Sequence, residues 1–463
     1  MSTQNTLTSE VVEYIQGLQY RSIPEPVVQE LKRCLVDGLG VMLRGSVSDC
    51  SQVIHRYIAE SNVQGTSAVI GTRTVTSAAL AALANGVAAH ADDYDDTQIS
   101  TTPDRIYGLL THPTTPVLAS SLAVAQEVNA SGKEFLTAFC GGFEVECKLA
   151  EAMNPRHYIQ GFHTTGTIGV FAAAAAAAKL YGLSPQQTRC ALGIAASKSA
   201  GLRVNFGTMT KPYHAGAAAE NGVVAARLAR LGYQSDPNAL DGQWGYFQVT
   251  SGGCDPDRLR GHLGNPYTLA WPGVSVKPYP CGSLSHPSMD AMLDLILEND
   301  IKPEQVEEVR LGAGHNILDP LRYQRPQNSL EAKFSLNFCL GILVLRRRAG
   351  TQEFTDQVVR SPQVQEMMAR VKTYHSPEIE AKGSDRMRSR VEVRLKDGRV
   401  LSRDAETSRG TPERPMGLDG MAAKFTDCAH GVLPDARIKT ALASIYRVDE
   451  MKSVGELVKV VTG

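Results

Sequence analysis

Apolar residues recur at helical spacing through most of the first ~265 residues, and this pattern constrains the fold more than any other feature of the chain. Between Pro26 and Gly45 they repeat every three or four positions, and Gly45 is the expected helix stop. A first helix is expected to open at Ser9, with Ser9 as its cap. Further helices are predicted over Ser77 to Ala91, Pro116 to Asn129, Gly132 to Glu151 and Val170 to Tyr181, and from Ser184 onward.

The pattern changes after about residue 266, where short strands begin to alternate with helices. Strands are predicted at 274–277 and 306–311, helices at 288–298 and 330–346, and a hairpin with Asp-Gly at its turn at 391–402. The tail from Gly417 to Val461 is helical again. We therefore expect a mostly α fold, with an all-helical domain of residues 1–267 plus 411–463 and an α+β domain of residues 268–410.

Four aspartates stand within five positions in the segment His90 to Thr97, whose sequence is His-Ala-Asp-Asp-Tyr-Asp-Asp-Thr. Like charges so close together are unfavourable unless a cation, a basic side chain or a proton relieves their repulsion. The cluster predicts either a chemical site, with Asp93 binding or relaying a proton, or a solvated loop at a helix end. A Mg²⁺ or Ca²⁺ site on Asp92, Asp93, Asp95 and Asp96 is a weaker hypothesis, because the spacing lacks the glycine turn of such loops.

Imidazoles and one lysine follow at junctions between loops and helices. His112 precedes a proline at a helix start, His163 lies in a Gly/Thr-rich turn before an Ala-rich helix, and Lys211 follows the loop Gly-Thr-Met-Thr. Helix starts favour anions, and a lysine there can clamp a carboxylate or work as an acid or base. His286 lies in a later loop bent by proline and glycine, and Tyr323 could donate a proton. Each residue alone is more often structural, but together they indicate a site for a small polyanion.

Composition and missing motifs argue against several classes of function. The formal net charge is −1 and the longest basic run is Arg346 to Arg348, so we expect no nucleic-acid partner. No apolar run reaches membrane-spanning length and the first residues lack a signal-peptide core, so we expect a cytoplasmic protein that binds no membrane. The chain has no GxGxxG after a strand, GxxxxGK[ST], GxSxG or HExxH, which argues against nucleotide, serine-hydrolase and zinc-protease chemistry.

Taken together, the motifs resemble the MmgE/PrpD family, which includes 2-methylcitrate dehydratase, cis-aconitate decarboxylase and iminodisuccinate epimerase. The resemblance covers nearly the whole chain. It is carried by the segments 90–97, 112–113, 161–163, 205–212 (Asn-Phe-Gly-Thr-Met-Thr-Lys-Pro), 280–281 with His286, and 330–335 (Leu-Glu-Ala-Lys-Phe-Ser).

The resemblance implies a helical domain built from both ends of the chain, an inserted α+β lid, a homodimer, and proton transfer next to a carboxylate without cofactor or metal. Six residues fall on active-site positions of the family, and Tyr323 corresponds more loosely. The roles that follow are catalysis by Asp93, His163, Lys211 and Tyr323, and substrate binding by Thr97, His112 and His286.

Three reactions and one non-enzymatic function remain open from the sequence. A dehydratase-like lyase on a small di- or tricarboxylate is the first expectation, with epimerisation or cis-aconitate decarboxylation as alternatives. Asp92 and Gln98 depart from the dehydratase pattern, and the segments 205–212 and 330–335 resemble the epimerases more. A binding protein on the same fold is the rival from another class. We also expect dimerisation through small-residue helices such as 172–178, and hinges near 266–272 and 410–415.

Overall fold

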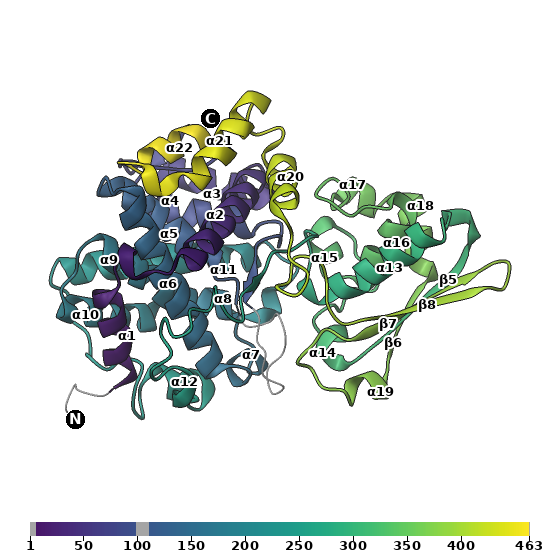
Figure 1. Cartoon of the computed structure of the whole chain (residues 1–463), viewed down its shortest axis with the longest axis horizontal. Helices are drawn as coiled ribbons and strands as arrows, with labels where there is room; N and C mark the ends of the chain where they lie inside the picture. Colours follow the sequence, from purple (N-terminus) through teal and green to yellow (C-terminus); the bar gives the residue numbers. More distant parts are fainter. Residues whose placement is uncertain (1–5, 99–110, 463) are drawn as a thin grey trace.

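The computed structural model describes residues 6–98 and 111–462, in which a large helical body stands beside a smaller α+β body (Figure 1). The first and last helices that the structure describes both lie in the helical body. The longer N-terminal helices are α1 (Leu7–Gly17), α2 (Glu25–Ser46), α3 (Asp49–Ser61), α4 (Ala78–His90), α5 (Thr114–Glu127), α6 (Gly132–Met153), α9 (Gly169–Leu180), α10 (Pro185–Lys198) and α11 (Thr210–Arg230). The short helices are α7 (Arg156–Ile159), α8 (Thr164–Thr167) and α12 (Tyr246–Ser251), and the C-terminal ones are α20 (Leu418–Ala429), α21 (Asp435–Tyr446) and α22 (Gly455–Val461). Within the described residues, no helix combines the length and the apolar character needed to cross a membrane.

Small residues let the central helices approach closely, as the Ala- and Gly-rich sequence predicts. Helix α11 packs along α4 and α9, and α5 packs against both α4 and α9. Gly86 of α4 faces Gly216 of α11, and a Cβ on Gly216 would lie 2.5 Å from the carbonyl oxygen of Leu83. The sequence was right about the helices but wrong about two ends. Thr6, not Ser9, caps α1, and α2 runs past Gly45, where a Cβ would lie 1.8 Å from the carbonyl oxygen of Ala88.

The Ala172–Ala178 stretch of α9 is an interior element of the helical body. Each of its seven alanines is at most 1% exposed, and all but Ala173 belong to the two main apolar cores of this body. The same chain therefore already covers the small-residue face that the sequence offered as a dimer surface. The prediction that these alanines form a dimer surface was therefore wrong, because neighbouring helices of the same chain pack against them.

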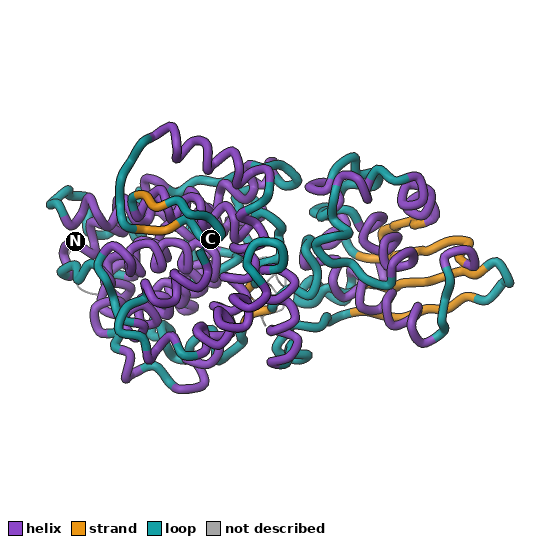
Figure 2. The backbone as a smooth tube through the Cα atoms, turned by 90° about the horizontal axis from the view of Figure 1, so that it is seen from above, coloured by secondary structure: helices purple, strands orange, loops and turns teal. Residues whose placement is uncertain are grey.

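The smaller body is a four-stranded sheet with helices packed on it, and Figure 2 shows its strands running outward, away from the helical body. The strand order is β6-β5-β7-β8, with β5 and β6 parallel and the other pairs antiparallel. Helices α13 and α16 pack on the sheet, with α18 against α16. The strands are β5 (Val306–Ala313), β6 (Val371–His375), β7 (Ser389–Leu395) and β8 (Val400–Ala405), and the helices are α13 (His286–Glu298), α14 (His315–Leu318), α15 (Ser329–Ala332), α16 (Leu336–Arg346), α17 (Asp356–Val359), α18 (Pro362–Arg370) and α19 (Pro377–Glu380).

The single helix predicted over 330–346 is two helices in the structure. Helix α15 ends at Ala332, and the hydroxyl oxygen of Ser335 accepts a hydrogen bond from the backbone N–H of Phe338 to start α16. Ser335 thus acts as a cap, a role that an apolar periodicity does not reveal. The break between the helices carries Lys333, whose Nζ lies 2.7 Å from Oδ1 of Asp92.

Backbone contacts join three segments: the acidic segment, the chain that enters the smaller body and the chain that leaves it. Strand β3 (Thr97–Gln98) pairs with β4 (Val274–Ser275), with Thr97 opposite Ser275. The next residue, Val276, donates its N–H to the carbonyl oxygen of Gly410, where the chain leaves the smaller body. A Cβ on Gly410 would lie 1.9 Å from the carbonyl oxygen of Val276, so the two connections touch at a glycine. A further pair, β1 (Ser67–Ala68) with β2 (Val75–Thr76), lies in the helical body.

The contact between α4 and α11 makes a prediction about stability. Gly216→Ala should lower the free energy of unfolding by about 3 kcal/mol, the upper part of the usual range for overpacking, because the added methyl meets backbone atoms that cannot turn away. Gly17→Ala is the matched control, since nothing lies within 4 Å of its Cβ position at the end of α1. Thermal unfolding should show a clear fall in Tm for the first variant and no fall for the second. Equal Tm values would contradict this close approach.

Candidate functional site

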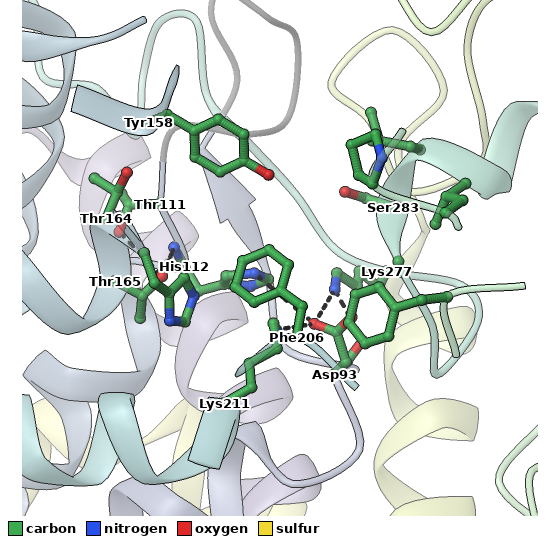
Figure 3. A pocket seen from close by; sticks show the side chains of 16 residues that line it. Asp93, Thr111, His112, Tyr158, Thr164, Thr165, Phe206, Lys211, Lys277 and Ser283 are labelled. Atoms are coloured by element: carbon green, nitrogen blue, oxygen red, sulfur yellow. Dashed lines mark hydrogen bonds and ion pairs between the residues drawn. The ribbon is translucent and has the colours of Figure 1, made fainter. Parts of the chain in front are cut away.

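A small cavity lies where the two bodies meet (Figure 3). Its volume is about 50 Å³. This is room for only a few water molecules. The helical body lines it with Asp93, Thr111, His112, Tyr158, His163, Thr164, Thr165, Phe206 and Lys211. The residues after 268 contribute Lys277, Gly282, Ser283, Leu284, Pro320, Leu321 and Phe334.

The carboxylate of Asp93 pairs with two buried lysines, one from each side of the cavity. Nζ of Lys211, in the first turn of α11, and Nζ of Lys277, just after β4, each lie 2.8 Å from Oδ1 of Asp93. The three residues are only 4%, 5% and 1% exposed for Asp93, Lys211 and Lys277. Burial alone would raise the pKa of Asp93, but the ammonium groups outweigh it and hold that pKa well below its usual range. Burial lowers the pKa of Lys211, and the negative charge of Asp93 opposes this shift.

Each of the other aspartates is relieved in a different way. Lys333 pairs with Asp92 and more than offsets the effect of burial, so the pKa of Asp92 is lowered. Asp95 accepts hydrogen bonds from His90 and from the hydroxyl of Thr115. Burial would raise its pKa, but the neighbouring imidazoles lower it.

Asp96 has no cationic partner among the described residues, and its pKa is raised instead. Thr114 donates to it from both its backbone N–H and its hydroxyl group. Burial, together with the nearby carboxylate of Asp37, raises the pKa of Asp96 to about 7. The segment predicted as either a chemical site or a wet loop is thus a buried charge network, with Asp93, Asp95 and Asp96 at most 4% exposed.

Three imidazoles gather beside Lys211. Nε2 of His90 lies 2.8 Å from Nζ of Lys211, and its ring centroid is 4.6 Å from that of His112 and 5.6 Å from that of His163. Burial lowers the pKa of all three histidines, furthest for His112 and His163, so all are neutral at physiological pH. His163 lines the cavity, and its Nε2 is buried without a hydrogen-bond partner among the described residues.

The four aspartates do not point at one place, so they do not form the shared metal-ligand set that the sequence suggested as an alternative. Two groups of histidine and aspartate atoms do lie within 4.8 Å of one another around His90 and His112. The ammonium group of Lys211 already lies between two of these residues, 2.8 Å from Nε2 of His90 and 2.8 Å from Oδ1 of Asp93. A cation is therefore present there as part of the protein itself.

A lysine of α20 joins several segments beside the site. Nζ of Lys424, in α20, donates to the carbonyl oxygens of Tyr94 and Lys277, at 2.8 and 2.9 Å. It also pairs with Asp37 of α2 at 2.6 Å. The acidic segment and the start of the smaller body are thus joined through one buried ammonium group.

The structure brings together four of the seven residues predicted for the site: Asp93, His112, His163 and Lys211 line the cavity. The other three are not among its lining residues. Thr97 lies in β3 with a buried hydroxyl group, His286 faces the carbonyl oxygen of Cys281 at 3.2 Å, and Tyr323 donates to the carbonyl oxygen of Phe206 at 3.3 Å. His286 begins α13 behind the lining loop 282–284, so its imidazole is turned into the smaller body.

Sequence reasoning missed Lys277, Tyr158 and Phe206, all of which line the cavity. A signal for Lys277 was present, because this lysine directly follows the predicted strand residues Val-Ser-Val at 274–276. In the structure only 1% of its surface is exposed. Tyr158 and Phe206 carried no such signal, since aromatic residues in short helical turns are most often core residues.

The fold and site define a helical protein with a buried, cation-lined cavity under an α+β body, and comparison with known proteins gives its family. Sequence models of the MmgE/PrpD N-terminal and C-terminal domains match residues 9–259 and 279–446. The chain belongs to the MmgE/PrpD family. Similar relatives are the cis-aconitate decarboxylases of Mus musculus, Homo sapiens and Aspergillus terreus, at 27%, 26% and 24% identity. Those matches cover 99% of this chain and 94%, 95% and 96% of the three relatives.

The pairing of Asp93 with two lysines makes a prediction about stability. Asp93→Asn should lower the free energy of unfolding by about 3–5 kcal/mol, because it leaves two buried ammonium groups without their carboxylate. Asp404→Asn is the matched control, since that carboxylate pairs with Arg390 at the surface and is 61% exposed. Urea unfolding should show a large loss for Asp93→Asn and little change for Asp404→Asn. A small loss at both positions would show that the lysines need no counter-ion.

The raised pKa of Asp96 predicts how stability changes with pH. An unfolded aspartate has a pKa of about 3.9, whereas that of folded Asp96 is about 7. Between these values the folded state holds one proton more than the unfolded state, so this group makes the free energy of unfolding fall as the pH rises. Asp96→Asn should remove a slope of up to about 1.4 kcal/mol per pH unit over that range. Urea unfolding of both proteins from pH 4 to 7 measures the difference, and parallel pH profiles would contradict it.

Proposed function

We propose that this protein is a cofactor-independent lyase that acts on a small di- or tricarboxylate by moving a proton at a carbon next to a carboxylate. One observation carries the proposal: two buried lysines and a histidine whose Nε2 has no hydrogen-bond partner among the described residues line a single small cavity. Lysines suit the binding of carboxylates, and an unpaired imidazole suits proton transfer. Similarity to cis-aconitate decarboxylases over nearly the whole chain supports the same class of reaction.

In this proposal Lys211 and Lys277 bind a substrate carboxylate and stabilise the enolate-like charge that develops beside it. Asp93 holds both lysine side chains in place, and its negative charge opposes the lowering of the Lys211 pKa by burial. Its own pKa lies too low for an efficient base near neutral pH, so we assign Asp93 to orienting the lysines.

His163 is the best-suited group for the proton itself. His163 lines the cavity, its buried Nε2 has no hydrogen-bond partner among the described residues, and its lowered pKa keeps the imidazole neutral. His112 is held differently: its Nδ1 donates to the carbonyl oxygen of Asp96 at 2.9 Å, which leaves its Nε2 without a hydrogen. We therefore assign His163 to proton transfer and His112 to positioning the substrate.

The bond that breaks after the proton step distinguishes dehydration, decarboxylation and epimerisation, and it depends on how the substrate lies in the cavity. The named relatives make decarboxylation of cis-aconitate the first reaction to test. Dehydration of 2-methylcitrate and epimerisation of iminodisuccinate follow it.

We further propose that residues 268–410 act as a lid in a homodimeric, cytoplasmic enzyme. The cavity is lined from both bodies and holds only a few waters, and separation of the bodies would make room for a tricarboxylate. The homodimer is proposed on family grounds alone, and light scattering should give a mass near twice 49.9 kDa.

A panel experiment tests the proposed chemistry. The protein is incubated in D₂O with cis-aconitate, 2-methylcitrate and iminodisuccinate, and NMR follows loss of CO₂, loss of water, change of configuration and deuterium incorporation next to a carboxylate. We expect turnover or exchange with at least one acid. If all three acids bind yet none exchanges a proton, the chain is a binding protein on the family fold.

Replacing Lys211 tests the role of the ammonium pair. Lys211→Ala should lower turnover by about 10² to 10³-fold, the usual cost of removing one group that stabilises developing charge. The fold should stay intact, because Asp93 keeps Lys277 as a partner. Lys459→Ala, at an exposed position of α22, is the matched control and should leave kcat/KM unchanged. Near-wild-type kinetics for Lys211→Ala would remove this lysine from the mechanism.

A further inference from the structure

A second histidine lies directly behind His163. Nδ1 of His163 and Nδ1 of His214 are 3.1 Å apart, and both residues are buried. His163 begins the short helix α8, whereas His214 lies on α11, three residues after Lys211. His214 does not line the cavity, so it meets His163 on the side away from the substrate.

Simple proton counting limits what this contact can be. A neutral imidazole carries one N–H, on either Nδ1 or Nε2. Two facing Nδ1 atoms at 3.1 Å form a hydrogen bond only when one carries hydrogen and the other does not. If His163 carries the hydrogen on Nδ1, its Nε2 at the cavity is a base. If His214 carries it, Nε2 of His163 holds an N–H and is an acid.

Neighbours fix the tautomers of the other two cavity histidines. Nζ of Lys211 donates to Nε2 of His90, so the ring hydrogen of His90 lies on Nδ1, which faces Asp95. His112 donates from Nδ1 to a backbone carbonyl, which can only accept. Of the three, His163 alone faces a group that can either donate or accept.

Two glycines allow the backbone to approach the side chain of His214 closely. A Cβ on Gly166 would lie 2.9 Å from Cβ of His214, and one on Gly201 would lie 3.4 Å from its ring. Gly201 also accepts a backbone hydrogen bond from His163, so the same segment positions both histidines. His214 keeps 7% of its surface exposed, against 3% for His163, and that surface lies outside the cavity.

We propose that His214 relays protons between His163 and solvent, which resets His163 between its basic and acidic forms while the cavity is closed. When Nε2 of His163 takes a proton from the substrate carbon, the hydrogen on its Nδ1 moves to Nδ1 of His214, and His214 releases its Nε2 hydrogen to water. Both rings stay neutral. In the acidic step the same movements run in reverse, and water supplies the proton. The relay rests on the proposed function, which gives His163 the proton transfer.

The first test does not depend on activity. ¹⁵N NMR of histidine-labelled protein should show one shared hydrogen between the two Nδ1 atoms, and His214→Ala should move the Nδ1 signal of His163. His157→Asn is the control, because His157 is buried nearby but bonds to Thr167 and to the carbonyl of Thr250. A hydrogen held permanently on Nε2 of both His163 and His214 would overturn the relay even if the enzyme proves active.

The second test separates relay from positioning. His214→Asn keeps a side chain that can hydrogen-bond Nδ1 of His163 but cannot pass a proton through it. We expect kcat to fall about 10²-fold, the lower end of the usual range for acid–base groups, with KM little changed and added imidazole restoring the rate. In D₂O the remaining turnover should return more of the original hydrogen to the substrate carbon. Wild-type kcat, or a loss that imidazole does not restore, would overturn the relay and leave His214 a structural residue.

Discussion

Two ammonium groups that are almost completely buried share one carboxylate, and most features of the site follow from that constraint. Removing a charge from water costs several kcal/mol unless an opposite charge lies close by. Asp93 meets this need for both Lys211 and Lys277 at 2.8 Å. Because one lysine comes from helix α11 and the other from the chain entering the α+β body, the pairing also joins the two bodies at the cavity.

The surrounding structure holds these three charges in place. Strands β3 and β4 align the acidic segment with the start of the smaller body, and Lys424 donates to the carbonyl oxygens of Tyr94 and Lys277 from the C-terminal helix α20. The N-terminal, middle and C-terminal parts of the chain therefore meet behind the cavity. A helical body built from both ends of the sequence suits this site better than two consecutive domains would. Its C-terminal helices return to support residues much earlier in the chain, and Lys424 lies 330 positions after Tyr94.

Much of this was predictable from sequence, because helical periodicity and like-charge repulsion act over short stretches of chain. The central helices were predicted nearly to their ends, and the four aspartates were predicted to need cations or protons. Lys211 was predicted as a site residue, but two other cations were not: Lys277 lies 184 positions from Asp93, and Lys333 lies 241 positions from Asp92. His286 shows the opposite error, since a histidine in a bent loop looks available until α13 turns its ring into the smaller body. The break at 333–335 was hidden for a related reason, because a serine cap inside an apolar run leaves the periodicity almost unchanged.

The central claim is that the ammonium pair on Asp93 is the place where a substrate carboxylate binds. A crystal structure of the wild-type protein bound to a slowly reacting or unreactive tricarboxylate tests this most directly. We expect one ligand carboxylate within hydrogen-bond distance of Nζ of both Lys211 and Lys277. The carbon next to that carboxylate should face Nε2 of His163. A ligand bound elsewhere, or in this cavity with its carboxylates turned away from both lysines, would contradict it.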